Sequence, residues 1–208
     1  DGIIHSGLGS SASAAVAMVG ALAKIRGLNL NRQQVAERAW DIEVNRMGLF
    51  GGKQDQYAAT FGGVNLIEFR QGGEVVTNQL SYQFIEKILP SIVLFYSGNN
   101  RSDAKIQEGL KEPKASQVDS LNALKSLVTS AIDPIIKGDI STFGTIMDRA
   151  WEMKKKSNKG ISNRDIDKIY DTARKHGAYG GKLLGSGGGG FMFFVVEPRI
   201  RKQFIESM

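Results

Sequence analysis

The stretch that decides the fold reads Gly7-Leu8-Gly9-Ser10-Ser11-Ala12-Ser13, and an alanine-rich apolar segment follows it without a break. Residues 10–26 have the composition of a buried helix, and Gly27 is a typical C-terminal stop. The first turn of a helix carries free backbone N–H groups and the positive end of the helix dipole, and glycines allow a ligand to approach the backbone closely. The pattern therefore indicates an anion site suited to phosphates.

Other interpretations bear on the same stretch. A serine-capped helix after a glycine turn would use the same residue types. A P-loop is excluded, because no Gly-Lys-Ser/Thr follows the glycines. The hydroxyls of Ser10, Ser11 and Ser13 could bind phosphate oxygens or a magnesium ion, so the phosphate site and the simple cap both remain open on spacing alone.

Glu43 is the first candidate metal ligand. It follows Ala39 by four residues and Trp40 by three, so it lies on their side of a predicted second helix. A carboxylate beside an apolar face needs a partner, and Mg²⁺ prefers oxygen ligands. A salt bridge with Arg46 or Lys53 is the alternative.

Asp55 is the second candidate acid. It begins a short predicted helix over residues 54–61, directly after the glycine-rich stretch Gly51-Gly52. An aspartate in this position could be an N-cap, or it could accept the proton of a substrate hydroxyl, as a base does in phosphoryl transfer. Lys53 could hold Asp55 ionised or stabilise phosphate charge.

The rest of the chain mixes strands and helices, so we expect the α+β class. Residues 64–69 and 75–80 flank a Gly-Gly pair and predict a hairpin, residues 91–96 and 191–196 predict buried strands, and most of the second half predicts helices. A soft boundary near residues 81–90 predicts two domains, 1–85 and 86–208.

A run of glycines precedes the last strand, at Gly185, Gly187, Gly188, Gly189 and Gly190. A tight turn before a strand would explain a glycine run. Ordering so many glycines costs backbone entropy, which is easier to understand if another backbone or a ligand comes very close.

Composition limits the classes of function. The chain has no cysteine, which excludes thiolate chemistry and is compatible with a cytoplasmic location, and no apolar run reaches the length of a membrane helix. The net charge of +6 favours anionic partners, and four lysines lie at residues 154–159. A basic nucleic-acid-binding module is the rival class. Aromatic residues make up only 8% and do not interleave with the lysines, which makes nucleic acid the weaker prediction.

Four features follow one another along the chain: the glycine-serine stretch at 7–13, Glu43, Asp55 and the glycine run at 185–190. In this order they resemble the motifs of the GHMP kinases. Residues 7–13 are similar to the phosphate-binding loop of that family, and residues 185–191 to its third, glycine-rich motif. The resemblance implies a two-domain fold, with an incomplete N-terminal part like domain 2 of ribosomal protein S5 and a ferredoxin-like C-terminal domain. It also implies that ATP binds Gly7, Leu8, Gly9, Ser10, Ser11, Ala12 and Ser13, that Ser11 and Glu43 ligate Mg²⁺, and that Asp55, with Lys53 beside it, is catalytic.

Within that family, residues 51–63 and 179–185 resemble heptose 7-phosphate kinases, which phosphorylate the anomeric hydroxyl for nucleotide-activated heptose synthesis. Arg101 falls where these kinases have a similar Arg-Ser pair, and either a contact with the substrate phosphate or a surface arginine would explain it. L-fucose kinase-like enzymes share similar motifs and remain an alternative. Family members carry a further segment ahead of the position of Asp1, so we expect a fragment that need not catalyse the reaction alone. The sequence does not indicate an oligomeric state.

Overall fold

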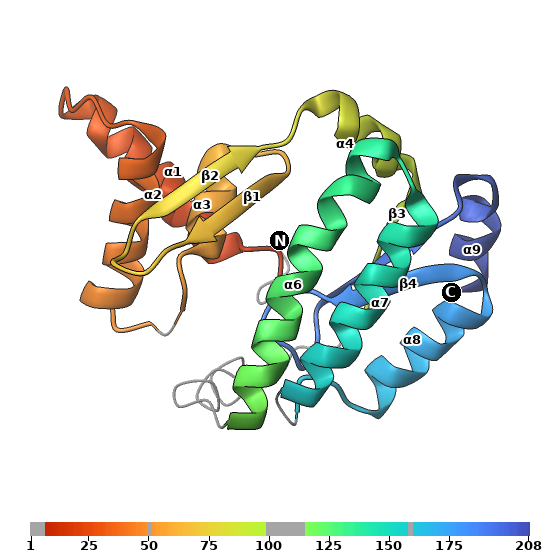
Figure 1. Ribbon diagram of the computed structural model, residues 1–208. Helices are drawn as coiled ribbons and strands as arrows, with labels where there is room; N and C mark the ends of the chain where they lie inside the picture. The colour runs from red at the N-terminus through yellow and green to blue at the C-terminus, as the bar shows by residue number, and fades with distance from the viewer. Residues whose placement is uncertain (1–6, 50, 99–114, 158–159) are drawn as a thin grey trace. The chain divides into compact units, whose positions relative to one another are not determined.

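A computed structural model describes residues 7–49, 51–98, 115–157 and 160–208 (Figure 1). Helices and strands both occur along the chain, which confirms the α+β class. The chain forms two compact units, an N-terminal unit of Gly9–Tyr82 and a C-terminal unit of Asp1–Leu8 with Gln83–Met208. The second half of the chain thus begins its unit at Gln83, and the first residues of the glycine-serine stretch, Gly7 and Leu8, belong to that C-terminal unit.

The N-terminal unit packs three helices and a two-stranded antiparallel hairpin. Its elements are α1 (Ser10–Ile25), α2 (Arg32–Trp40), a π-helical segment (Asp41–Arg46), α3 (Gln54–Phe61), β1 (Asn65–Phe69) and β2 (Val75–Gln79). Asn31 caps α2 through a reciprocal pair of 2.9 Å hydrogen bonds with Gln34. Small residues at the contacts, among them Ala15 and Ala39, are buried and allow these helices to pack closely.

The predicted second helix does not stay regular to its end. The hydrogen bonds widen to a π-helical pattern over Asp41–Arg46, and Glu43 lies inside this segment. Short π-helical segments are rare and often occur at functional sites. Here the change of pitch decides which side of the helix the Glu43 carboxylate occupies.

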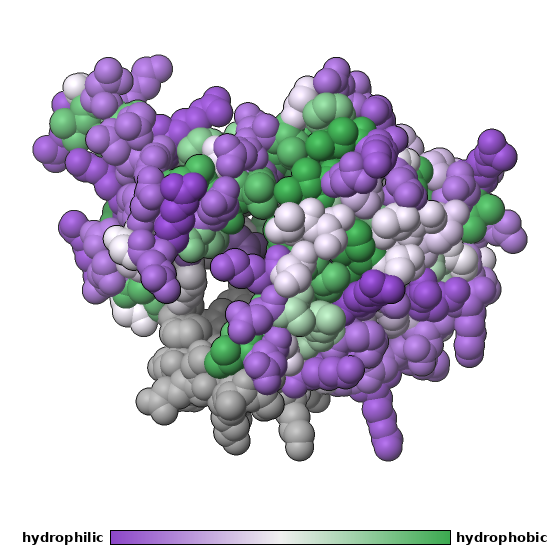
Figure 2. Space-filling view, in the orientation of Figure 1, coloured by the Kyte–Doolittle hydropathy of each residue, from purple (hydrophilic) through white to green (hydrophobic). Residues whose placement is uncertain are grey.

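The C-terminal unit is built on an antiparallel sheet with the strand order β3-β5-β4. Its elements are α4 (Tyr82–Ile88), β3 (Ile92–Tyr96), α6 (Ala115–Lys137), α7 (Ile140–Ser157), α8 (Arg164–Lys175), β4 (Ala178–Leu183), β5 (Phe191–Val196) and α9 (Arg201–Ser207), with short 3-10 turns at Leu89–Ser91 and Pro198–Ile200. Trp151, Ile166, Phe194 and Phe204 form the centre of its core, where they are almost fully buried. On the face shown in Figure 2, hydrophobic residues gather around α4 and the neighbouring end of α6, where Lys87 of α4 donates a hydrogen bond to Ile136 O at 2.9 Å.

Strand β4 was not among the predicted strands, because its Gly180-Gly181 pair lacks the side chains that favour a strand. The glycines serve packing instead. A methyl group at Gly180 would overlap the carbonyl oxygen of Gly144 in α7, and one at Gly144 would overlap the Tyr179 side chain. The pair Gly144 and Gly180 therefore lets α7 lie directly on the sheet.

Two further observations complete the fold. Within the part of the chain that the structure describes, no helix is both long and apolar enough to cross a membrane. Arg101, the predicted substrate contact, lies outside the described residues.

Candidate nucleotide and magnesium site

A buried carboxylate connects the start of α1 with α3. Glu43 is only 7% exposed, and its two carboxylate oxygens accept hydrogen bonds from different residues. Ser11 Oγ donates to Oε1, and Gln56 Nε2 donates to Oε2 at 2.7 Å. The structure thus brings together a hydroxyl from the first turn of α1 and a carboxylate that lies 32 residues further along the chain.

Glu43 does not form either of the salt bridges considered above. Arg46 pairs with Asp41 at 2.9 Å, and Lys53 pairs with Glu37 at 2.7 Å. Among the described residues, Glu43 has no cationic partner. A buried carboxylate with only neutral donors retains much of its negative potential, so it is a good ligand for a cation.

Asp55 lies against the same loop. A Cβ atom built on Gly9 would be 3.8 Å from the Asp55 Cβ and 3.9 Å from its carboxyl carbon, which places the acid beside the backbone that precedes α1. Burial raises the pKa of Asp55, and the negative charge of Glu43 raises it further. Two carboxylates that repel each other at the start of a helix favour a bound cation between or beside them.

The residues present could hold a magnesium ion that also binds water and substrate phosphates. No group of three or more His, Cys, Asp or Glu side chains in the described residues could hold a metal ion by itself. Mg²⁺ usually binds one or two protein carboxylates and completes its octahedron with water and substrate phosphates. Ser11 and Glu43 could supply the protein ligands of such an ion, and the buried, unpartnered Oε1 atom of Gln56 is a further oxygen in the cluster.

No serine side chain caps the start of α1. Its N-cap is Gly9, which has φ +71° and no side chain to cap the helix, and no acidic residue occupies the first turn. Ser10, Ser11 and Ser13 are exposed, whereas Ala12 is buried. The carboxylates at this helix end therefore come from outside α1, from Glu43 and Asp55, and a bound cation would offset their charge beside a phosphate.

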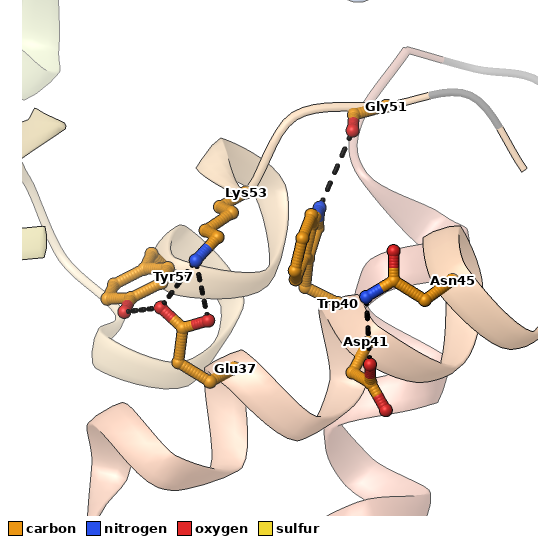
Figure 3. Close-up of polar contacts among 7 residues, drawn as sticks. All are labelled: Glu37, Trp40, Asp41, Asn45, Gly51, Lys53 and Tyr57. Atoms are coloured by element: carbon orange, nitrogen blue, oxygen red, sulfur yellow. Dashed lines mark hydrogen bonds and ion pairs between the residues drawn. The ribbon is translucent and has the colours of Figure 1, made fainter. Parts of the chain in front are cut away.

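Lys53 is held by a network that the sequence did not indicate (Figure 3). Its ammonium group donates to both Glu37 carboxylate oxygens, at 2.7 and 3.0 Å, and lies 4.5 Å from the centre of the Trp40 ring. The Tyr57 hydroxyl donates to Glu37 at 2.5 Å, and Trp40 Nε1 donates to Gly51 O at 3.5 Å. Glu37 therefore compensates the charge of Lys53. The raised pKa of Asp55 has its causes in burial and Glu43, and Lys53 is not one of them.

This network fixes the segment that carries Asp55. Lys53 and Tyr57 bracket Asp55 in sequence, and both are bound to the same carboxylate on α2. Neither Glu37 nor Gln56 was predicted from the sequence. Glu37 lies three residues before Trp40 on the same side of α2, which is the one local signal that could have pointed to it.

The second glycine motif lies in the C-terminal unit, where it contacts the start of the first one. A Cβ built on Gly7 would be 3.0 Å from Leu184 O, and one built on Gly185 would be 2.8 Å from Gly7 Cα. Gly188 N donates to Ile161 O at 2.9 Å, and Gly190 O accepts from the backbone and side chain of Ser97 at 2.9 Å. The glycines at 185 and 187–190 all have positive φ, so a side chain would strain each of these positions.

These features occur on a chain that matches the GHMP kinases at both ends: the family description "GHMP kinases N terminal domain" matches residues 3–63, and "GHMP kinases C terminal" matches residues 131–208. The chain belongs to the GHMP kinases.

Its similarity extends to particular members. It is 36% identical over 207 residues to D-glycero-alpha-D-manno-heptose 7-phosphate kinase of Campylobacter jejuni, covering 98% of this chain and 61% of that protein. It is 26% identical over 215 residues to L-fucokinase/L-fucose-1-P guanylyltransferase of Bacteroides fragilis, covering 97% of this chain and 22% of that protein.

Solved structures give the same family. A D-glycero-D-manno-heptose 1-phosphate kinase from Bacteroides thetaiotaomicron superimposes with a TM-score of 0.72 at 29% identity, covering 100% of this chain and 58% of that one. A sugar kinase from Campylobacter jejuni superimposes with a TM-score of 0.73 at 32% identity, covering 98% and 59%. The chain thus spans about three-fifths of the length of the heptose 7-phosphate kinase and of these two solved kinases.

Proposed function

We propose that the protein carrying this chain is an ATP-dependent sugar kinase that phosphorylates the anomeric hydroxyl of a heptose 7-phosphate. The observation that carries the proposal is the meeting of Ser11, Glu43 and Asp55 at the start of α1. This arrangement combines a phosphate-binding helix end, two ligands for Mg²⁺ and an acid beside them. The relatives named above support the sugar phosphate as acceptor.

In this proposal residues 7–13, which include the start of α1, hold the ATP phosphates. A magnesium ion, when bound by Ser11 and Glu43, neutralises phosphate charge. Gln56 keeps the Glu43 carboxylate oriented through its 2.7 Å hydrogen bond. The network of Glu37 with Lys53 and Tyr57 keeps the first turn of α3 in place, so that Asp55 presents its carboxylate at a fixed position.

Asp55 acts on the acceptor. Its carboxylate orients the sugar hydroxyl and takes the hydroxyl proton as the oxygen bonds to the γ-phosphorus and the bond to the leaving ADP breaks. Partial burial and the nearby Glu43 charge raise the pKa of Asp55, which makes it a better base than an aspartate with an unshifted pKa. Lys53 supports this acid by position, through Glu37, rather than by direct charge pairing.

The test is a substrate comparison with the whole protein. ADP release is measured with Mg·ATP and, in separate reactions, heptose 7-phosphate, unphosphorylated heptose, L-fucose and mevalonate. The proposal predicts the highest kcat/KM for heptose 7-phosphate and a 1,7-bisphosphate product by NMR. A clear preference for L-fucose would instead assign the protein to the second candidate function, which the 26% identity to the fucokinase supports. Turnover with none of these acceptors would overturn both.

A further inference from the structure

Two lysines of the C-terminal unit converge beside the second glycine loop. Lys154, on α7, donates a hydrogen bond from Nζ to Gly185 O at 2.6 Å, and the same atom lies 3.5 Å from Leu183 O. Lys182 is the neighbour of Leu183 on β4. Because side chains alternate along a strand, Lys182 points to the same face as Gly180, which is the face that packs on α7.

No described residue neutralises either lysine. The acids near them on α7 have other partners, since Glu152 pairs with Lys155 at 2.7 Å and Asp148 accepts a hydrogen bond from Tyr170 at 2.5 Å. Burial and the nearby Lys182 charge lower the pKa of Lys154 to about 8, and burial also lowers the pKa of Lys182. Two partly buried ammonium groups whose charges repel each other, with no acid to offset them, cost stability unless a ligand supplies the negative charge.

The residue after Gly185 supplies a third group. The Ser186 hydroxyl is buried and has no hydrogen-bond partner among the described residues. Ser186 directly follows Gly185, whose carbonyl oxygen Lys154 contacts, and the glycines around it hold the backbone in conformations that no other residue adopts easily. A buried hydroxyl without a partner points to a ligand that would complete its hydrogen bonding.

We propose that Lys154, Lys182 and Ser186 form a subsite for a phosphate group. Two lysine ammonium groups and one hydroxyl match a phosphate monoester, which carries up to two negative charges and has several acceptor oxygens. This inference rests on the proposed function for the source of that phosphate, which is the phosphate already present on the sugar acceptor. The phosphates of the nucleotide have the same chemistry, and the experiment distinguishes the two sources.

The first arm uses the unsubstituted chain and needs no activity. An amine-reactive reagent is applied at about pH 7.5, and the labelling rate of each lysine is followed by mass spectrometry, with the exposed Lys156 as the reference on the same helix. Inorganic phosphate is expected to slow the labelling of Lys154 and Lys182 but not of Lys156. Heptose 7-phosphate and Mg·ATP are then compared. Protection by the sugar phosphate assigns the acceptor as the source, protection by Mg·ATP alone assigns the nucleotide, and protection by none of the three overturns the subsite.

The second arm uses the whole protein. Lys182→Met is expected to raise the KM for heptose 7-phosphate about 10- to 100-fold, the value of a hydrogen bond to a charged group, with little change in the KM for ATP. Lys182→Arg should restore most of the affinity, and Lys156→Met should behave as the parent. An equal loss with unphosphorylated heptose would contradict a phosphate contact. If the kinase reaction is absent but inorganic phosphate still protects both lysines, the subsite stands and the proposed function falls.

Discussion

Asp55→Asn is expected to make the protein inactive and more stable at once. Asp55 lies in the first turn of α3, where the helix dipole favours a negative charge by about 0.3–1 kcal/mol. Nevertheless its pKa is raised, so burial and the repulsion from Glu43 outweigh the dipole in the folded protein. Asparagine has nearly the same shape and removes the charge. Because Asp55 is exposed, solvent screens part of this repulsion. We therefore expect the free energy of unfolding to rise by about 0.5 kcal/mol at pH 7, or about 2–4 °C in Tm for a unit of this size.

The pH dependence of this gain follows from the direction of the shift. A carboxyl whose pKa is higher in the folded than in the unfolded state destabilises the fold at pH values above its folded pKa. This cost disappears once both states are protonated, below the unfolded value of 3.8. The difference in Tm between Asp55→Asn and the parent should therefore be full at pH 7 and shrink as the pH falls toward 4.

Two measurements check this prediction. Thermal unfolding from pH 4 to 8 gives the stability, and ADP release by the whole protein gives the turnover, which should fall by about 10²- to 10⁴-fold. Asp41→Asn is the matched control, because the Asp41 side chain is 39% exposed and its pKa is lowered by hydrogen bonds from Asn45 and Arg46. A variant at Asp55 that melts below the parent and keeps its turnover would refute the reasoning.

The remaining predictions concern the metal, the helix–sheet contact and the network around Lys53. Glu43→Gln should raise the Mg²⁺ concentration needed for half-maximal activity. Its Tm should change little, because the Gln56 amide can turn its unpartnered oxygen toward the new side chain. An unchanged Mg²⁺ titration would remove Glu43 from the metal site. Chelation with EDTA should stop ADP release, and added Mg²⁺ should restore it; activity that survives chelation would argue against a metal requirement. Gly144→Ala should lower the free energy of unfolding of the C-terminal unit by about 1–3 kcal/mol in urea, because the new methyl group overlaps Tyr179. Gly160→Ala is the control: nothing lies within 4 Å of the added methyl group there, so this variant tests the effect of a positive φ alone. Glu37→Gln should weaken the bonds to Lys53 and cost about 1 kcal/mol together with a drop in kcat; equal kcat for the two proteins would mean that the network does not position Asp55.

The parts of the fold that depend on short-range pattern could be predicted. The capping box at Asn31, the helix that starts at Gln54 and the hairpin around Gly72 all follow from residues a few positions apart. Strand β4 could not be predicted in this way. Its glycines count against a strand locally, and they are explained only by the close approach of Gly144 from α7.

The same division applies to the candidate site. The residue types at Ser11, Glu43 and Asp55 were recognisable, and the family resemblance gave them roles. Their partners were not recognisable, because Gln56 and Glu37 contact residues 13 to 20 positions away across separate helices. The pairing of Lys53 with Glu37, rather than with an acid of the site, depends on the tertiary packing of α2 and α3.

The most direct measurement is a crystal structure of the protein with a non-hydrolysable ATP analogue and Mn²⁺ in place of Mg²⁺. Mn²⁺ can be located by its anomalous scattering. The account predicts that the ion lies about 2.0–2.3 Å from Ser11 Oγ and a Glu43 carboxylate oxygen, with the phosphates at the start of α1 and the Asp55 carboxylate facing the γ-phosphate. An ion bound away from both Ser11 and Glu43, or a triphosphate held elsewhere on the chain, would contradict it.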